Sequence, residues 1–150
     1  MVETILVPTE GSNHADKAVA FAADIAEKYH ADIVLLHVMS GPGTGRVPDE
    51  LRSLARLEHL DIAECDFRQA GASELLRRAE VVARKHGATR IDSVIEEGDP
   101  TRRILACAEA RGADLIVMGS RGLDDLQGLL LGSVSHKVGH LAKCTCITVR

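Results

Sequence analysis

Aromatic residues are scarce in this chain, and several features typical of other protein classes are missing from it. Only 2% of its 150 residues are aromatic and there is no tryptophan, so valine, isoleucine, leucine and alanine must build the core. No apolar run approaches the roughly 18 residues of a membrane span, and the first residues, MVETILVP, do not read as a signal peptide. The net charge of −4 provides no basic excess, so neither nucleic acid nor an anionic membrane is expected as a partner.

Cysteine and histidine are present, but not in patterns that indicate a metal or redox site. The four cysteines, none of them in a C-x-x-C pair, are Cys65, Cys107, Cys144 and Cys146. Free thiols in a reducing, cytoplasmic compartment are the simplest interpretation. His136 and His140 have a spacing that can bind metal on a helix. Because no third ligand accompanies them, a surface or interface role is favoured.

The hydrophobic pattern alternates between strands and helices along the whole chain. Buried or alternating strands are expected at 4–7, 32–38, 90–96, 114–118 and 144–149. Helices are expected from about 13 to 29, 49 to 87, 100 to 112 and 133 to 142, with a glycine-rich loop over 40–48. Ser12 is the expected N-cap of the first helix, Asp99 or Thr101 caps the third, and Gly71 is a point where the second helix could be interrupted.

This alternation predicts an α/β fold, with one domain over residues 1–150. The expected architecture is a five-stranded parallel, doubly wound (Rossmann-like) sheet with helices on both faces. In such sheets, ligands bind beyond the carboxyl ends of the strands, near the point where the strand order reverses. Three segments lie at expected carboxyl ends: the turn of Pro8, Thr9 and Glu10, the residues at Val38, and the loop that begins at Gly119.

The loop after the fourth expected strand carries the most informative motif. It reads Gly119-Ser-Arg-Gly122, then nine residues, then Gly132-Ser133, and it leads into a helix. Glycines at these offsets let backbone N–H groups approach a bound anion, and the serine adds a hydroxyl donor. The motif therefore predicts a phosphate cradle, and so a nucleotide site.

The motif is not a Walker A loop, because no lysine follows Gly132. The dinucleotide fingerprint G-x-G-x-x-G is absent as well. Arg121 is the only basic residue inside the loop, which leaves few charges to stabilise a departing phosphoryl group. The loop thus favours holding a nucleotide over hydrolysing it efficiently.

With these motifs the chain resembles the universal stress protein family, in its ATP-binding branch. The spacing Gly-x2-Gly-x9-Gly-Ser matches that branch. The flanking blocks agree in order along essentially the whole chain: Ile5–Pro8 with Gly11-Ser12, Leu35–Val38, Gly98–Pro100, Asp114–Gly119 and Gly132–Ser135. Glu10 stands where the family commonly has aspartate, which keeps the carboxylate but moves it about one methylene further.

The resemblance implies an adenine nucleotide site, with ATP, ADP or AMP bound and Mg²⁺ held by the phosphates. Gly119, Gly122, Gly132 and Ser133 would hold the phosphates and ribose, and Val134 and Ser135 would add contacts at the helix start. Pro8, Thr9, Glu10 and Val38 would line the adenosine side, with Met118 and Arg121 as further neighbours. The family also implies a homodimer that pairs through its last strand.

The function that follows from this resemblance is nucleotide-dependent regulation in a stress response, with an unidentified protein partner. Two alternatives stay open at this point. One is an interaction module of the same fold that does not depend on nucleotide, and the other is a slow ATPase or phosphotransferase. No catalytic residue is assigned, and no serine, histidine or cysteine constellation of a hydrolase is evident.

Overall fold

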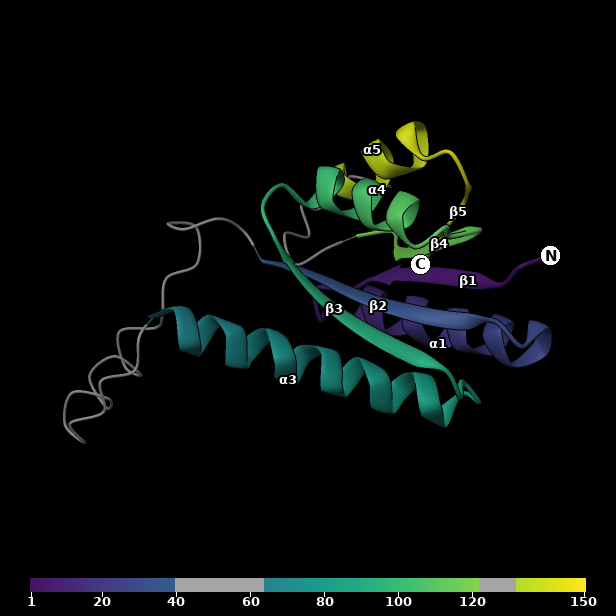
Figure 1. Cartoon of the computed structure of the whole chain (residues 1–150), viewed down its shortest axis with the longest axis horizontal. Helices are drawn as coiled ribbons and strands as arrows, with labels where there is room; N and C mark the ends of the chain where they lie inside the picture. Colours follow the sequence, from purple (N-terminus) through teal and green to yellow (C-terminus); the bar gives the residue numbers. More distant parts are fainter. Residues whose placement is uncertain (40–63, 122–131) are drawn as a thin grey trace.

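A five-stranded, fully parallel sheet forms the centre of the molecule (Figure 1). The computed structural model describes residues 1–39, 64–121 and 132–150. Its strands are β1 (Thr4–Pro8), β2 (Asp32–Met39), β3 (Ile91–Glu97), β4 (Leu115–Gly119) and β5 (Thr145–Val149). They lie in the order β3-β2-β1-β4-β5, so the strand order reverses between β1 and β4. The predicted doubly wound α/β fold is confirmed.

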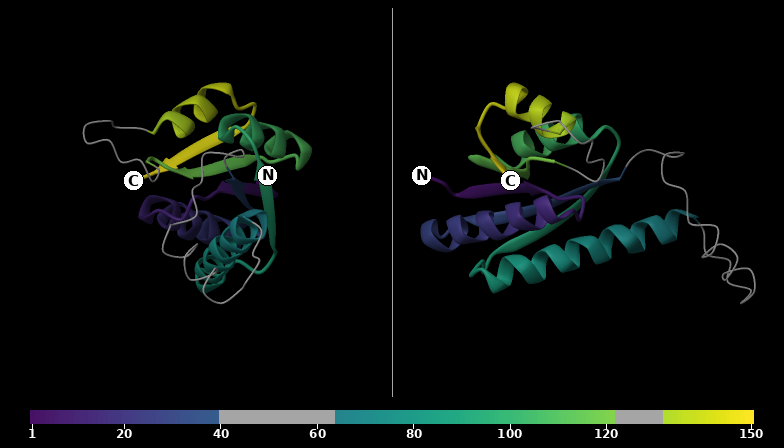
Figure 2. Two further views of the ribbon diagram at one scale, coloured as in Figure 1. Left: turned by 90° about the vertical axis from the view of Figure 1, so that its left-hand side faces the viewer. Right: turned by 180° about the vertical axis from the view of Figure 1, so that it is seen from behind.

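Four helices cover the two faces of the sheet within the described part of the chain. They are α1 (Asn13–Tyr29), α3 (Glu64–Lys85), α4 (Pro100–Ala110) and α5 (Ser133–Leu141). Helices α1 and α3 lie together on one face, and α4 and α5 on the other (Figures 1 and 2). Among the described residues, no helix is both long and apolar enough to cross a membrane.

Neighbouring residues of a strand contribute their side chains to two separate hydrophobic cores, one on each face of the sheet. Ile5 and Val7 of β1 pack with the apolar faces of α1 and α3, whereas Leu6 packs with α4 and α5. This division follows from the period of two along a strand, which sends neighbouring side chains to opposite faces. Because both faces are covered, β1 reads as a continuous apolar run rather than an alternating one.

The helix ends follow the capping signals in the sequence. Ser12 caps α1 by accepting a hydrogen bond from the Ala15 N–H, and Asp99 caps α4 by accepting one from the Arg102 N–H. Helix α3 ends two residues before Gly87, and it runs through Gly71 without interruption. The predicted loop over 40–48 and the first part of the predicted helix, 49–63, lie outside the described residues.

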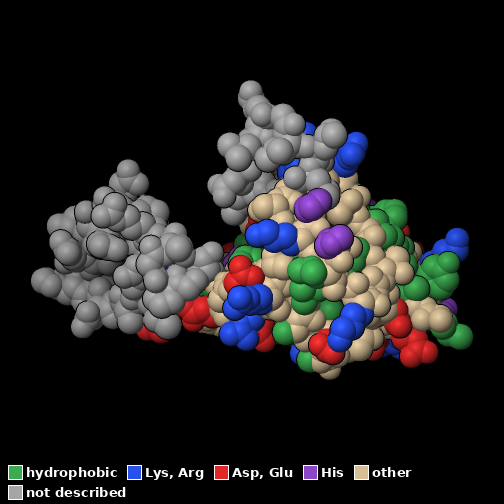
Figure 3. Space-filling view, turned by 90° about the horizontal axis from the view of Figure 1, so that it is seen from above, with side chains coloured by type: hydrophobic (Ala, Val, Ile, Leu, Met, Phe, Trp, Pro, Cys, Tyr) green, Lys and Arg blue, Asp and Glu red, His purple; other side chains and the backbone are tan. Residues whose placement is uncertain are grey.

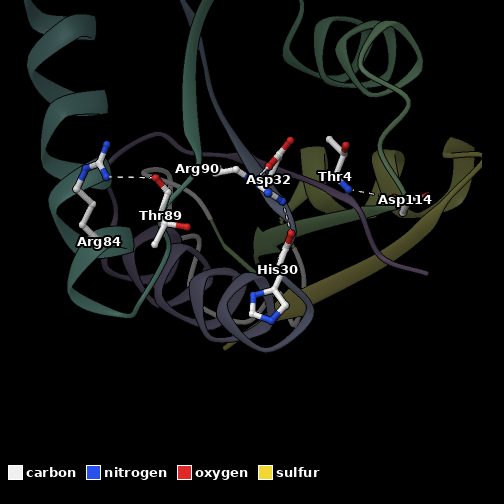
Figure 4. A network of polar contacts seen from close by, with 7 residues as sticks. All are labelled: Thr4, His30, Asp32, Arg84, Thr89, Arg90 and Asp114. Carbon is white, nitrogen blue, oxygen red and sulfur yellow. Dashed lines mark hydrogen bonds and ion pairs between the residues drawn. The ribbon is translucent and has the colours of Figure 1, made fainter.

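Polar contacts tie the strands together at the amino-terminal edge of the sheet (Figure 4). Arg90, just before β3, pairs with Asp32 at the start of β2 and donates to the His30 carbonyl. Asp114, just before β4, accepts hydrogen bonds from the backbone N–H groups of Glu3 at 2.8 Å and Thr4 at 3.0 Å. These contacts hold the edge of the sheet that is opposite to the expected site.

The two backbone hydrogen bonds lower the pKa of Asp114 from its ordinary value of 3.8. Because the pKa is lower in the folded state, the carboxylate stabilises the fold above pH 3.8 and loses this effect as pH falls through the folded value. We expect Asp114→Asn to destabilise the protein at neutral pH and to match the parent more closely as the pH falls below about 3.8. Urea unfolding at a series of pH values measures this, and a difference that stays constant down to acid pH would contradict it.

The outer face over α4 and α5 carries charges of both signs (Figure 3). His136 and His140 are both exposed on α5, and no group of three metal-ligating side chains occurs among the described residues.

Cys107 of α4 is buried, and Cys144 and Cys146 pack half-buried against the same core. Burial raises the pKa of all three thiols, so they stay protonated and are weak nucleophiles at neutral pH.

Candidate functional site

A pocket of about 550 Å³ opens at the carboxyl ends of β1, β2 and β4. Its size is in the usual range for small-molecule sites, and it lies where the strand order reverses. The strand ends supply Pro8, Thr9, Glu10, Leu36, His37, Val38, Met39, Met118, Gly119 and Arg121. The helices supply Arg68, Gly71, Ala72 and Leu75 from α3, Pro100 and Ile104 from α4, and the segment 132–135 at the start of α5.

The turn after β1 holds the only carboxylate among the described pocket-lining residues, that of Glu10. Gly11 has φ +83°, a left-handed conformation that glycine adopts at no steric cost, and this lets the chain reverse into α1. The Ser12 hydroxyl donates to the Glu10 carboxylate while it accepts from the Ala15 N–H. The longer side chain of glutamate is therefore anchored to the first turn of α1, beside the pocket.

His37 links the ends of β2 and β1. Its Nδ1 lies 2.9 Å from the Thr9 carbonyl oxygen, and the Thr9 N–H donates to the Leu36 carbonyl at 2.8 Å. Because a carbonyl only accepts, Nδ1 carries the proton in this contact. The half-buried ring is thus hydrogen-bonded, as expected for a histidine in a strand, and it also forms part of the pocket wall.

Gly119 is required by packing between β4 and α1. A Cβ atom at this position would lie 2.8 Å from the backbone carbonyl carbon of His14 and 3.0 Å from the Ala15 nitrogen. Both atoms belong to the first turn of α1 and cannot move without shifting that helix. The sequence pattern suggested a glycine for ligand approach, and the structure adds a steric reason inside the protein.

Residues 119–133, which carry the glycine motif, are called the glycine segment, and Ser120 links its two described ends, 119–121 and 132–133. Its N–H donates to the Val149 carbonyl at 2.7 Å, and its own carbonyl accepts from the Gly132 N–H at 2.6 Å. The Ser135 hydroxyl lies 3.3 Å from the same carbonyl and 3.0 Å from the Gly132 carbonyl. The N–H of Gly132 and the hydroxyl of Ser135 are therefore engaged within the protein.

The first turn of α5 presents backbone donors at the pocket wall. Gly132 is the N-cap residue and provides no side-chain cap. The N–H groups of Ser133, Val134 and Ser135 have no partner inside the helix, as at any helix start. No hydrogen bond within the described parts of the chain uses them. Together with the helix dipole they form a region that favours an anion.

Charged side chains lie on different walls of the pocket. Arg121 follows β4, Arg68 comes from α3, and Glu10 comes from the turn after β1. Both guanidinium groups are charged at any physiological pH. The described pocket lining thus carries more positive than negative charge, in a protein whose net charge is −4.

All the residues selected from the sequence line this pocket, except Gly122, which lies outside the described residues. The residues selected from the sequence did not include the contributions from α3 and α4, nor Leu36, His37 and Met39 of β2. Helical periodicity gave no sign that residues of α3 face a pocket, because the same spacing describes a helix face packed on a sheet. Only the tertiary arrangement brings this face to the strand ends.

Comparisons with known proteins agree with this geometry. The sequence model of the universal stress protein family matches residues 1–150. Universal stress protein YxiE of Bacillus subtilis (strain 168) is 33% identical over 162 residues, covering 100% of this chain and 100% of that relative. Universal stress protein UspA from Lactobacillus plantarum has a solved structure that is 26% identical, with a TM-score of 0.78, covering 99% of this chain and 98% of that one.

A further solved structure is of a universal stress protein in complex with cAMP. It is 27% identical to this chain, with a TM-score of 0.72, and the match covers 99% of this chain and 97% of the other. The family match spans every residue, and the sheet order, the pocket at the strand ends and the glycine segment agree with it. The chain therefore belongs to the universal stress protein family.

Proposed function

We propose that this chain is a single nucleotide-binding domain that binds an adenine nucleotide in the pocket at the strand ends and acts as a nucleotide-dependent regulator in a stress response. ATP is the proposed main ligand, with ADP or AMP in the same place. The observation that carries the proposal is the first turn of α5, where the N–H groups of Ser133, Val134 and Ser135 meet the pocket. A relative that was solved with cAMP supports the adenine nucleotide as the ligand class.

In this proposal, the phosphates lie against the glycine segment and the start of α5. Gly119, Gly122, Gly132 and Ser133 border the phosphates and ribose, with Arg121 beside them. Pro8, Thr9, Glu10, Val38 and Met118 border the adenosine half. No cluster of three metal-ligating side chains occurs among the described residues, so Mg²⁺ would be held by the phosphates themselves.

Binding, rather than rapid hydrolysis, is the proposed activity. The chain has no lysine in the Walker A position and one arginine in the glycine segment. Phosphoryl transfer depends on positive charge around the developing anion. A preparation that binds ATP and releases phosphate only slowly is therefore expected.

We further propose a homodimer that pairs through β5. The other edge strand, β3, carries charged side chains that form ion pairs. Its Asp92 lies 2.6 Å from Arg111, and its Glu96 lies 3.7 Å from Arg103. Charged side chains on an edge strand oppose pairing with another chain. Strand β5 instead reads TCITV, without a charged residue.

We also propose a reducing, cytoplasmic location for the protein. The protonated, weakly nucleophilic thiols of Cys107, Cys144 and Cys146 are compatible with such a compartment.

Identification of the retained ligand is the most direct test. Freshly purified protein is denatured, and the released small molecules are identified by mass spectrometry. The stripped protein is then titrated with Mg²⁺-ATP by isothermal calorimetry, with Mg²⁺-GTP as the comparison. We expect a retained adenine nucleotide or saturable ATP binding that is tighter than GTP binding. If no nucleotide is retained and none binds, the proposed function is wrong.

A further inference from the structure

One face of α3 forms a wall of the pocket, and it includes a glycine, a residue that is disfavoured within a helix. The residues at this wall are Arg68, Gly71, Ala72 and Leu75, which follow the spacing i, i+3, i+4 and i+7 of a single helix face. Leu75 packs inward, with its Cδ1 atom 3.2 Å from the place where a Cβ of Gly11 would lie. On this face, the two residues between Arg68 and Leu75 are small, namely Gly71 and Ala72.

Gly71 has no steric reason to be glycine within the described protein. A Cβ atom there would meet nothing within 4 Å, and the residue lies in the interior of a regular α-helix. Glycine is less favourable than alanine at such a position by about 1 kcal/mol. The residue thus leaves open space on the wall of the pocket, next to Arg68.

Arg68 brings a partly buried positive charge to this space. Its side chain is 22% exposed, whereas that of Arg103 on α4 is 49% exposed. Its Nη1 lies 3.7 Å from Oε1 of Glu97, at the end of β3. A guanidinium has five N–H donors on three nitrogens, so Arg68 can contact an anion on the pocket side in addition to its partners within the protein, Glu97 among them.

We propose that Arg68 binds an anionic group of the ligand, and that Gly71 keeps the wall open for that group. This inference rests on the proposed function and deepens it. The site then recognises phosphate from two directions, with the start of α5 on one side and α3 on the other. It would favour nucleotides with several phosphates over nucleosides.

The test compares ligands of graded charge on matched arginine variants. Arg68→Gln removes the charge but keeps a polar side chain, and Arg68→Lys keeps the charge. Arg103→Gln is the control, since Arg103 also lies 3.7 Å from a glutamate of β3, namely Glu96, and does not line the pocket. Affinities for ATP, AMP and adenosine are measured by calorimetry, after thermal unfolding confirms that each variant is folded.

We expect Arg68→Gln to weaken ATP binding about tenfold or more, AMP binding by less, and adenosine binding not at all. Arg68→Lys should recover part of the ATP affinity, and Arg103→Gln should bind all three ligands like the parent. Equal losses for ATP and adenosine, or no loss for either, would overturn the inference while leaving nucleotide binding intact. If the parent protein binds no nucleotide, the proposed function itself fails.

A second variant tests the open wall independently of Arg68. Gly71→Gln places a side chain in the empty space. The variant should be at least as stable as the parent, because glutamine is a better helix former than glycine. We expect it to weaken ATP binding about tenfold. Unchanged ATP affinity in a folded Gly71→Gln protein would count against the α3 wall as a ligand surface.

Discussion

Gly119→Ala should destabilise the protein by about 3 kcal/mol, although it adds a single methyl group. The new Cβ would lie 2.8 Å from the carbonyl carbon of His14 and 3.0 Å from the Ala15 nitrogen. The first turn of α1 cannot easily retreat, because Ser12 caps it and its buried alanines pack on the sheet. Strand β4 cannot move either, since it is paired on both sides, with β1 and β5.

Urea and thermal unfolding measure this effect. For a chain of this size, each kcal/mol corresponds to about 2–4 °C in the melting temperature, so a decrease of about 10 °C is expected. Gly139→Ala is the matched control, because Gly139 lies within α5 and a Cβ there would meet nothing within 4 Å. That variant should be as stable as the parent or up to about 1 kcal/mol more stable. Similar effects of the two substitutions would contradict a steric role for Gly119.

Local signals explain why so much of the fold could be predicted from the sequence. The buried runs around Ile5 and Ile33 are continuous because both faces of the sheet are covered, so each one marks a parallel strand. Ser12 and Asp99 cap their helices through hydrogen bonds within three residues, and such contacts depend little on the rest of the fold. The carboxyl ends of β1, β2 and β4 then had to share one edge of the sheet.

The α3 wall of the pocket depends on contacts between segments far apart in the sequence, and for this reason it was not predicted. Arg68 reads as one more arginine on a polar helix until α3 is placed beside the end of β2. The role of Gly119 is similar, because its neighbour His14 is 105 residues earlier in the chain. The glycine pattern also gave no sign that Ser120 would engage the N–H of Gly132. The backbone N–H groups that remain for an anion are those of Ser133, Val134 and Ser135.

Gly132→Asp should therefore weaken ATP binding at least about 100-fold without unfolding the protein. Gly132 has φ −67° and ψ 154°, a conformation open to any residue, and a Cβ there would lie 3.4 Å from both the Ser120 carbonyl oxygen and the Ser135 hydroxyl, in ordinary contact. Aspartate is a favoured N-cap residue that accepts from the second or third N–H of the helix. The free energy of unfolding should stay within about 0.5 kcal/mol of that of the parent or rise slightly.

The same carboxylate would occupy the N–H groups of Val134 or Ser135 and add a negative charge where the phosphates are proposed to bind. A hydrogen bond to a charged group contributes about 1.5–3 kcal/mol, and each 1.4 kcal/mol is about tenfold in affinity. With the loss of one or two such bonds and the added repulsion, ATP affinity measured by calorimetry should fall at least about 100-fold.

Two further substitutions at Gly132 separate the causes of this loss. Gly132→Asn caps the same N–H groups without a charge, so it should lose part of the ATP affinity. Gly132→Ala adds only a methyl group and should lose the least. The order Ala, Asn, Asp would show that both the α5 donors and the local charge act on the phosphates. A folded Gly132→Asp protein that binds ATP as tightly as the parent would mean that the phosphates lie elsewhere in the pocket. Arg68 and α3 would then be the next place to look for them.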